Sequence, residues 1–261
     1  MTQRLFWLRL AAIFIAPGLA VPLAALAIAA PADPLKSPMW ENHAAWLFGK
    51  QTVVFDPAVQ VLMPDVTENQ RIFPVTVDAR ALSGVQRIVV LMDLNPLPVA
   101  IDYRPEGALG YVSLRIKLDQ RTPVRAAVLT ADGVWHVAGR WIDAAGGGCS
   151  APPVSRVKGD WAQHLGELRG RLWREAEDQR LRVLVRHPMD TGMVDNIAAY
   201  NLETMTVRSA DGVMLGTMTI NGSVSEDPAF TVLLPKETKG AVAVHLADTN
   251  GRTFDGKVSA P

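Results

Sequence analysis

Short apolar runs separated by turn residues dominate the chain from residue 51 onward, and they most constrain its fold. Val, Ile and aromatic residues are concentrated in eight such runs: QTVVFD, VQVLMP, IFPVTVDA, VQRIVVLMD, VAIDYRP, YVSLRIKL, VRAAVLTAD and VWHVAGRWI. Several alternate apolar with polar residues, and Pro, Gly, Asn or Asp lies between them. This spacing is typical of antiparallel strands in a β-sandwich. Asp132-Gly133 indicates a hairpin between two of the runs.

A second series of strand-like runs occupies residues 181–261. Its members are LRVLVRHPMDTG, YNLETMTVRSADGVMLGTMTING, AFTVLLP, GAVAVHLADTNG and RTFDGKVSA. Asp211-Gly212 and Asn250-Gly251 predict two more hairpins. The chain is therefore predicted to be all-β, with one sandwich domain over residues 33–143 and a second over residues 181–261.

Two other segments precede and separate these series. Residues 33–50 are expected to form a short helical or irregular lead-in whose Trp40, Trp46 and Leu47 pack on the first domain. Residues 144–159 are crowded with Gly and Pro and read as a flexible arm.

A connector over residues 160–180 follows the arm. It places Trp161, Leu165, Leu168 and Leu172 at helical spacing, which favours a short helix. Within it, the stretch ELRGRLW is equally compatible with a strand, because Gly166 and Gly170 weaken a single helix.

The first 32 residues have the features of a secretory signal peptide. Two arginines precede an uncharged apolar run that ends in small residues, and cleavage after Ala32 is favoured over cleavage after Ala29. The alternative is an uncleaved membrane anchor, since the run is about long enough to span a bilayer. Pro17, Gly18 and Pro22 weaken a continuous helix there. We therefore expect an exported protein whose mature form has no membrane segment.

The charge balance excludes some classes of partner. The chain has 26 basic and 26 acidic residues. A nucleic-acid-binding protein needs an excess of Lys and Arg, and a polybasic membrane patch is also missing. We expect neither nucleic acid nor a membrane surface as a partner.

The only cysteine of the chain, Cys149, lies in the arm within the stretch DAAGGGCSAPP. Unpaired cysteine in an exported protein indicates a reactive thiol or an intermolecular partner. Gly146, Gly147 and Gly148 have no side chains to shield the sulfur or stiffen the backbone, so we expect Cys149 to be exposed and mobile. A mobile thiol suits carrying a bound group between enzymes better than catalysis in place, which needs a fixed base. The alternative is a linker cysteine without a role.

The five histidines do not form a metal motif, because no pair has ligand spacing and the cysteine has no local partner. We expect no metal and no cofactor. His187, in the stretch HPMDTG, is the one histidine in a distinctive setting. Pro188 and Gly192 favour a structural role for it in a turn that leaves a strand.

Several stretches resemble the SoxYZ family, the periplasmic sulfur carriers of thiosulfate oxidation. GGGCSAP is similar to the carrier-arm motif around Cys149, and LNPLPVAIDYRP to the Asn-Pro segment of the carrier component. HPMDTG, VSEDPAF and VHLADTNGRTFDGKV resemble the second component, in the expected order. The chain is similar to a fused single-chain form, of the kind described as quinoprotein dehydrogenase-associated SoxYZ-like carriers.

The resemblance implies two Ig-like sandwiches and a periplasmic, non-enzymatic carrier that holds a sulfur-containing group on Cys149. It implies partners among redox enzymes, either of the sulfur-oxidation type or a quinoprotein dehydrogenase or cytochrome. The chain departs from the family in that Ser150-Ala151-Pro152-Pro153 follows the cysteine, so the arm is tethered at both ends. Two alternatives stay open: an interaction module in which Cys149 is incidental, and a dimer linked through Cys149.

Overall fold

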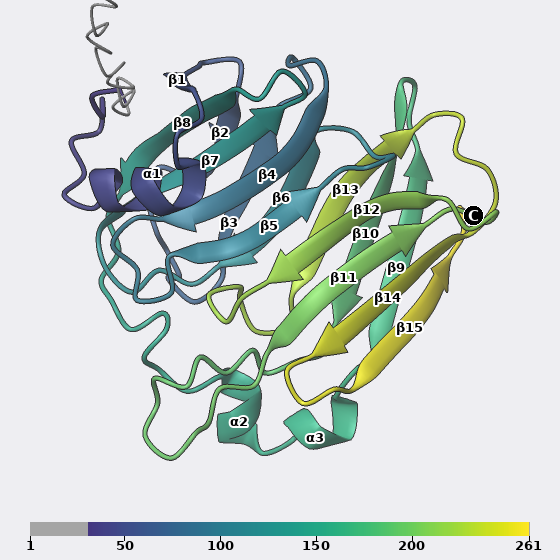
Figure 1. Cartoon of the computed structure of the whole chain (residues 1–261). Helices are drawn as coiled ribbons and strands as arrows, with labels where there is room; N and C mark the ends of the chain where they lie inside the picture. Colours follow the sequence, from purple (N-terminus) through teal and green to yellow (C-terminus); the bar gives the residue numbers. More distant parts are fainter. Residues whose placement is uncertain (1–30, 261) are drawn as a thin grey trace, which may run out of the picture.

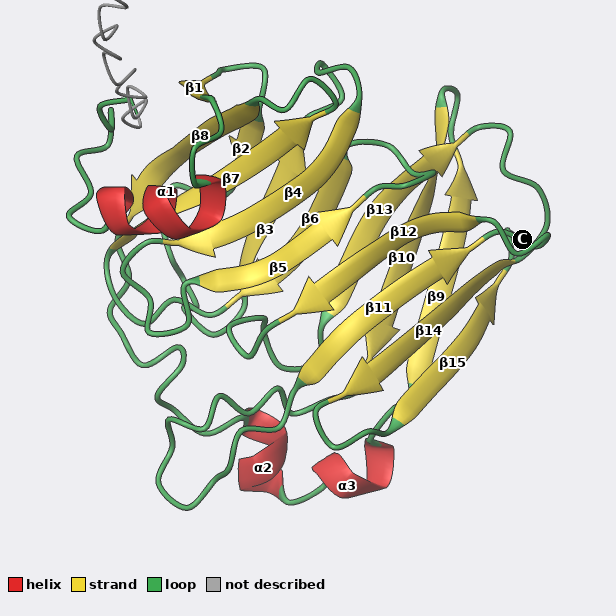
Figure 2. Cartoon of the chain, viewed as in Figure 1, coloured by secondary structure: helices red, strands yellow, loops and turns green. Residues whose placement is uncertain are grey.

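Two β-sheets that face each other form the body of the protein, as the computed structural model shows for residues 31–260 (Figures 1 and 2). The all-β prediction is confirmed. The expected signal segment, residues 1–32, lies almost wholly outside the described residues. Among residues 31–260, none of the helices has the length and hydropathy needed to cross a bilayer.

The sheets have nine and six strands. In spatial order the larger sheet consists of β1 (Val53–Phe55), β8 (Trp135–Ile142), β7 (Thr122–Thr130), β4 (Val85–Met92), β5 (Val99–Arg104), β12 (Met214–Ile220), β11 (Leu202–Arg208), β14 (Val242–Asp248) and β15 (Thr253–Val258). The smaller sheet consists of β2 (Gln60–Leu62), β3 (Phe73–Asp78), β6 (Tyr111–Ile116), β13 (Ala229–Pro235), β10 (Asp178–Val185) and β9 (Leu168–Arg174).

Both sheets run without a break from the first half of the chain into the second. In the larger sheet β5 pairs with β12, placing Ile101 opposite Ile220. In the smaller sheet β6 pairs with β13, placing Ser113 opposite Thr231. Inward-facing side chains from both halves form one continuous apolar core. The two series of strands therefore share their sheets at a seam.

Strand formation follows the alternation in the sequence. In β6, Val112, Leu114 and Ile116 are buried, while the residues between them are partly exposed. The expected hairpins are confirmed, because β7–β8, β11–β12 and β14–β15 are each joined by the Asp-Gly or Asn-Gly turns. Glycine supplies the positive φ that such turns need.

The lead-in forms helix α1 (Trp40–Phe48), which covers part of the outer face of the larger sheet (Figure 1). Trp40 and Leu47 are buried there, as expected, but the expectation for Trp46 is wrong, since its side chain is 51% exposed. Trp46 donates its indole N–H to His43 and lies on the outer side of the helix.

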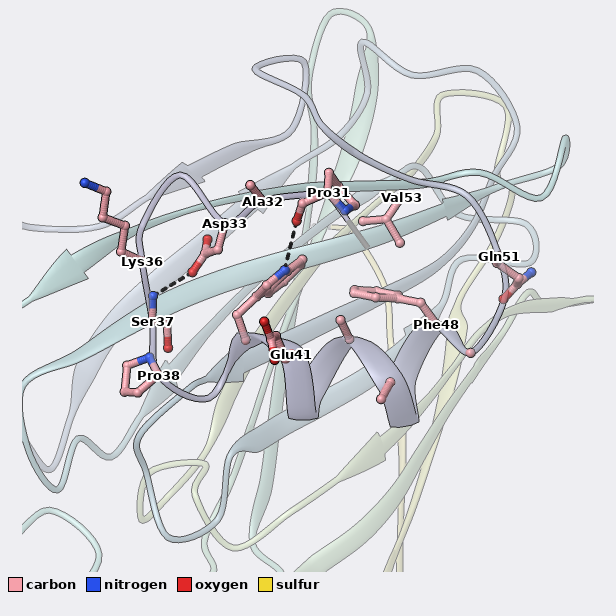
Figure 3. A pocket seen from close by; sticks show the side chains of 14 residues that line it. Pro31, Ala32, Asp33, Lys36, Ser37, Pro38, Glu41, Phe48, Gln51 and Val53 are labelled. Carbon is pink, nitrogen blue, oxygen red and sulfur yellow. Dashed lines mark hydrogen bonds between the residues drawn. The ribbon is translucent and has the colours of Figure 1, made fainter. Parts of the chain in front are cut away.

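A hollow of about 700 Å³ lies between α1 and the segment before it (Figure 3). Two hydrogen bonds fix that segment: Asp33 accepts from the backbone N–H of Ser37 at 2.7 Å, and Trp40 donates to the Pro31 carbonyl at 3.2 Å. Arg125, buried in β7, clamps both oxygens of Asp33 at 2.7 and 2.9 Å.

The connector is shorter and less helical than expected. Helices α2 (Val154–Lys158) and α3 (Trp161–His164) end before β9 begins at Leu168, so the strand alternative for ELRGRLW is the correct one. Gly170 faces inward, where a Cβ atom would lie 2.1 Å from Val258 on β15. Glycine at this position lets β9 pack closely against the opposite sheet, which explains a residue that disfavours both helix and strand.

Candidate functional site

The arm that follows β8 lies in the seam between the two halves, and it buries the single thiol. Cys149 is 1% exposed, so the expectation of an exposed sulfur is wrong for this structure. The glycine run does not hold the chain away from the body, because polar groups of both halves bind the backbone around the cysteine. Whether the arm moves stays a prediction.

Hydrogen bonds from both halves hold the arm. The Asp119 carboxylate, just after β6, accepts from the backbone N–H of Cys149 at 3.0 Å and of Ser150 at 3.2 Å. The Ser150 hydroxyl also donates to it at 3.1 Å. From the second half, the Thr191 hydroxyl donates to the Cys149 carbonyl at 2.6 Å. Gln70 donates its side-chain amide to the Gly146 carbonyl at 2.7 Å. These contacts define the seat of the arm.

Backbone conformation explains the glycines at positions 146 and 147 of the seat, and close packing explains the glycine at position 148. Gly146 and Gly147 have φ values of 99° and 80°, a backbone region that side-chain-bearing residues rarely adopt. At Gly148 a Cβ atom would lie 2.3 Å from the Leu118 carbonyl oxygen and 2.8 Å from that of Gln70. Gly148 is therefore required for close approach of the arm to the body. The predicted role of these residues in flexibility is a separate property that the seated conformation does not test.

A buried ammonium group lies beside the seam. Lys117 is 5% exposed, and its Nζ donates to the carbonyls of Met189 and Gly222, the latter at 2.9 Å. Both acceptors belong to the second half, so Lys117 ties the halves together. Burial lowers the pKa of Lys117 to about 8, with the nearby Cys149 acting in the opposite direction.

The environment of the sulfur keeps it protonated. Burial raises the pKa of the Cys149 thiol to about 11, while the positive charge of Lys117 opposes the rise and Asp119 adds to it. Asn95 directs its side-chain N–H toward the sulfur at 3.8 Å and also donates to the Lys117 carbonyl at 2.7 Å. Because the thiolate is the nucleophile, a seated Cys149 is chemically quiet at neutral pH.

His187 follows β10 and is buried next to the seat rather than in it. Its Nδ1 accepts from the Met189 N–H at 3.1 Å, and its ring packs against Tyr200 at 4.6 Å between centroids. Its Nε2 lies 3.7 Å from the Asp248 carboxylate. Burial lowers the pKa of His187 to about 4, so the ring is neutral. The preferred structural interpretation fits this geometry, and Asp190 in the same stretch forms an ion pair with Arg156 of α2.

Sequence reasoning found Cys149 and the glycines but missed four polar residues around them: Asn95, Lys117, Asp119 and Thr191. Lys117 comes directly after the apolar alternation of β6 and reads as a solvated residue. Asn95 lies within a stretch that was picked out only by resemblance, and Thr191 lies in HPMDTG, where the argument concerned His187 and the turn residues. Within residues 31–260, no cluster of three or more His, Cys, Asp or Glu residues is placed to hold a metal ion.

Fold and site together define a two-sheet β protein that holds one protected thiol at the junction of its halves. Comparison with protein families matches residues 44–149 to the sulfur oxidation protein SoxY and residues 173–259 to the sulphur oxidation protein SoxZ. The first match ends at the cysteine, and the two together cover most of the chain. The chain therefore belongs to the SoxYZ-like sulfur-oxidation carriers, with both components fused in one polypeptide.

Two solved structures match this chain at low sequence identity. The sulfur carrier protein SoxY from Chlorobium limicola f thiosulfatophilum is 23% identical, and the match covers 41% of this chain and 91% of that protein, with a TM-score of 0.36. A beta-glycosidase from Bacteroides vulgatus is 11% identical, and the match covers 77% of this chain and 24% of that enzyme, with a TM-score of 0.24. Comparison with curated proteins gives no match.

Proposed function

We propose that the protein is a periplasmic covalent carrier that holds a thiosulfate-derived or related sulfur group on Cys149. The observation that supports it most directly is the position of the only thiol. Cys149 is the last residue of the SoxY match and lies in a seat assembled from both components. In this proposal the seat protects the thiol between loading events, and the released arm presents it to partner redox enzymes.

Loading requires removal of electrons as well as exposure of the sulfur. Joining the Cys149 thiol to the outer sulfur of thiosulfate forms one S–S bond and releases one proton and two electrons. Cys149 is the only cysteine of the chain, so no second thiol is present to form a disulfide and take up these electrons. In this proposal the electrons pass to a partner with a redox centre, either a sulfur-oxidation enzyme or a quinoprotein dehydrogenase or cytochrome.

Tethering of the arm at both ends limits what it can enter. Residues from Asp143, after β8, to Pro153, before α2, connect two fixed points, so the loop reaches out as a hairpin rather than as a free end. The Arg71 guanidinium also donates to the Pro152 carbonyl at 3.2 Å and restrains the C-terminal side of the arm. A partner with a shallow site near the protein surface is therefore favoured over one with a deep, narrow channel.

Intact-mass analysis of the protein purified from its native periplasm tests the proposal. We expect an adduct that disappears on treatment with a reductant and that is missing from Cys149→Ser. Growth of a Cys149→Ser strain on a reduced sulfur compound should be impaired. Absence of any adduct, together with normal growth of that strain, would contradict the carrier role.

The burial of Cys149 favours one alternative enough to name it. A thiol with a pKa of about 11 that is 1% exposed suits a structural cysteine in an interaction module for a quinoprotein or cytochrome. That alternative predicts that Cys149→Ser preserves partner function, whereas the carrier proposal predicts its loss. The same burial argues against a dimer linked through Cys149 in the seated conformation.

A further inference from the structure

The outer face of the smaller sheet carries four arginines that form no salt bridge among the described residues, which we call the arginine face: Arg115 on β6, Arg169 and Arg171 on β9, and Arg182 on β10. Their neighbours along each strand, such as Leu172 and Val183, point inward and are buried. Within residues 31–260, none of the four forms a salt bridge or a side-chain hydrogen bond. They stand on three strands of one continuous sheet.

The pairing register places two of these charges directly against each other. Arg171 on β9 lies opposite Arg182 on β10. Like charges at directly opposed positions of an antiparallel pair are destabilising. Three acidic groups lie beside the face and have other partners: Glu175 pairs with Arg180 at 3.0 Å, Asp227 with Arg186 at 2.7 Å, and Glu167 with His164 at 2.6 Å. Among the residues that the structure describes, no acidic side chain forms a salt bridge with Arg171 or Arg182. The fold therefore accepts a local repulsion that an acidic surface from outside would relieve.

An aromatic ring between two guanidinium groups extends this face. Trp173 on β9 is partly exposed, and the guanidinium carbons of Arg171 and Arg180 lie 5.0 and 4.7 Å from its ring centroid. Stacking orders Arg171 while it leaves its N–H groups free to bind carboxylates, whereas Arg180 is already engaged with Glu175. Trp and Arg together are the residues most enriched among the strongly contributing positions of protein interfaces.

A hollow of about 410 Å³ lies at the edge of the arginine face, and its lining is mixed in charge: Arg115, Arg169 and Arg186 face Glu167 and Asp227 across it. A neighbouring hollow of about 250 Å³ shares Arg115 and Arg186 and reaches Val154 at the start of α2. The Glu226 carboxylate binds that helix start through the Val154 N–H at 2.7 Å. The arginine face is thus adjacent to the segment that leaves the cysteine arm.

The equivalent face of the larger sheet in the second half differs in character. Its outward positions include Thr204, Thr206 and Ala243, and its His245 is paired with Asp255 at 2.8 Å. Its basic residues are not stacked on each other across the strands: Arg208 donates to the Gly212 carbonyl at 3.0 Å, and Lys257 lies opposite Ala243. Because the whole chain has equal numbers of basic and acidic residues, the unpaired arginines are a local concentration rather than a general excess. Charge complementarity therefore points to a partner that carries the opposite charge.

We infer that the arginine face docks an acidic patch on the partner protein that processes the group held on Cys149. The inference rests on the proposed carrier function for the identity of the partner. Docking on this face would place the partner beside the arm, so that release of a tethered hairpin suffices for contact. Carboxylates of the partner would take the bidentate positions that Arg171 and Arg182 leave open.

The test uses the full mature protein and a fluorescent peptide of repeated Glu-Ala-Asp units as a probe of acidic surface. We expect the wild-type protein to bind the peptide, with affinity that falls as salt is added. Arg171→Glu/Arg182→Glu should weaken binding at least about tenfold. The matched control, Arg104→Glu/Lys257→Glu, makes the same change in net charge on exposed strand positions of the other sheet and should bind like the wild type.

A second readout connects the face to the partner. A native periplasmic extract should remove the Cys149 adduct from the wild type and the control at equal rates, and from Arg171→Glu/Arg182→Glu at least about tenfold more slowly. Unchanged removal from that variant would overturn the inference and leave the carrier proposal standing. Equal loss of binding in both double variants, or tighter binding of a DNA duplex than of the peptide, would also overturn it.

The two proposals fail in distinguishable ways. Peptide binding does not need the thiol, so Cys149→Ser should bind the peptide as the wild type does. If no adduct ever forms while binding still depends on Arg171 and Arg182, the carrier role fails and an acidic docking surface remains. If adducts form and turn over regardless of these arginines, the docking surface fails.

Discussion

The steric requirement at Gly148 gives the sharpest test of the seat, because one methyl group should expel the arm. A Cβ atom there would lie 2.3 Å from the Leu118 carbonyl oxygen and 2.7 Å from the Leu118 nitrogen, both backbone atoms. Those atoms cannot retreat easily, since the Leu118 N–H is bonded to the Gln70 carbonyl at 2.7 Å. We therefore expect Gly148→Ala to leave the two sheets intact and to release Cys149 into solvent.

The size of the effect follows from the thiol pKa. Seated, Cys149 has a pKa of about 11, so roughly one thiol in a thousand is ionised at pH 8. A released thiol with an ordinary pKa of about 8.5 is ionised to roughly one quarter at the same pH. Ionisation alone then predicts that a chromogenic aromatic disulfide reacts roughly 200-fold faster with Gly148→Ala than with the seated wild type.

The assay follows release of the coloured thiolate under folding conditions across a range of pH. Gly147→Asn is the matched control, because a Cβ at Gly147 meets no atom within 4 Å and Asn tolerates its φ of 80°. If the wild-type thiol reacts while it is seated, the pH dependence of its labelling rate should have a midpoint near pH 11. If it reacts only during brief opening of the arm, the midpoint should lie near pH 8.5 and the rate should be lower at every pH. If folded Gly148→Ala reacts as slowly as the wild type, this account of the burial is wrong.

Three further changes probe the surroundings of the seat. Asp119→Asn removes the charged acceptor of two backbone N–H groups of the arm. The rate of thiol labelling at Cys149 should therefore rise several-fold to tens-fold. A rate equal to that of the wild type would show that Asp119 does not hold the arm. Lys117→Met leaves the buried carbonyls of Met189 and Gly222 without a donor. The free energy of unfolding, measured by chemical denaturation, should therefore fall by about 2–4 kcal/mol. A loss below about 1 kcal/mol would contradict the role of Lys117 in holding the two halves together. Burial holds the pKa of His187 at about 4, below its value in the unfolded chain, so the unfolded state takes up the proton first as the pH falls. Stability should therefore drop by roughly 1 kcal/mol per pH unit between about pH 6 and 4.5, and His187→Phe should flatten that slope.

The sequence predicts the strands well because their burial follows the simple period of two. Val112, Leu114 and Ile116 alternate inward, and Asp-Gly turns close the hairpins at the expected places. The sequence does not predict that the two halves share their sheets. The pairing of β5 with β12 depends on backbone N–H and C=O groups, which every edge strand exposes. The alternation of side chains therefore does not identify which edge strands pair.

The candidate site was predicted only in part for a related reason. A glycine run has two physical readings, freedom of the backbone and tolerance of close approach, and composition cannot separate them. At Gly148 the second reading applies, because backbone atoms of Leu118 and Gln70, in loops next to the arm, occupy the space of a side chain. Lys117 was missed because its two acceptors, the carbonyls of Met189 and Gly222, lie far from it in the chain.

A buried thiol is compatible with a carrier function if the arm leaves its seat readily enough to meet a partner and stays seated enough of the time to shield the Cys149 thiol from oxidation. The bonds that Asp119, Thr191 and Gln70 make with the arm favour the seated state, and the backbone entropy recovered on release opposes them. Because the two contributions are of similar size, an open form is within reach, and a partner can capture it. Fusion of the two components supports this balance, because Thr191 and Asp119 reach the arm from opposite halves of the chain. Separating those halves would remove the Thr191 side of the seat. The Cys149 thiol would then be more exposed and more readily oxidised between encounters with a partner.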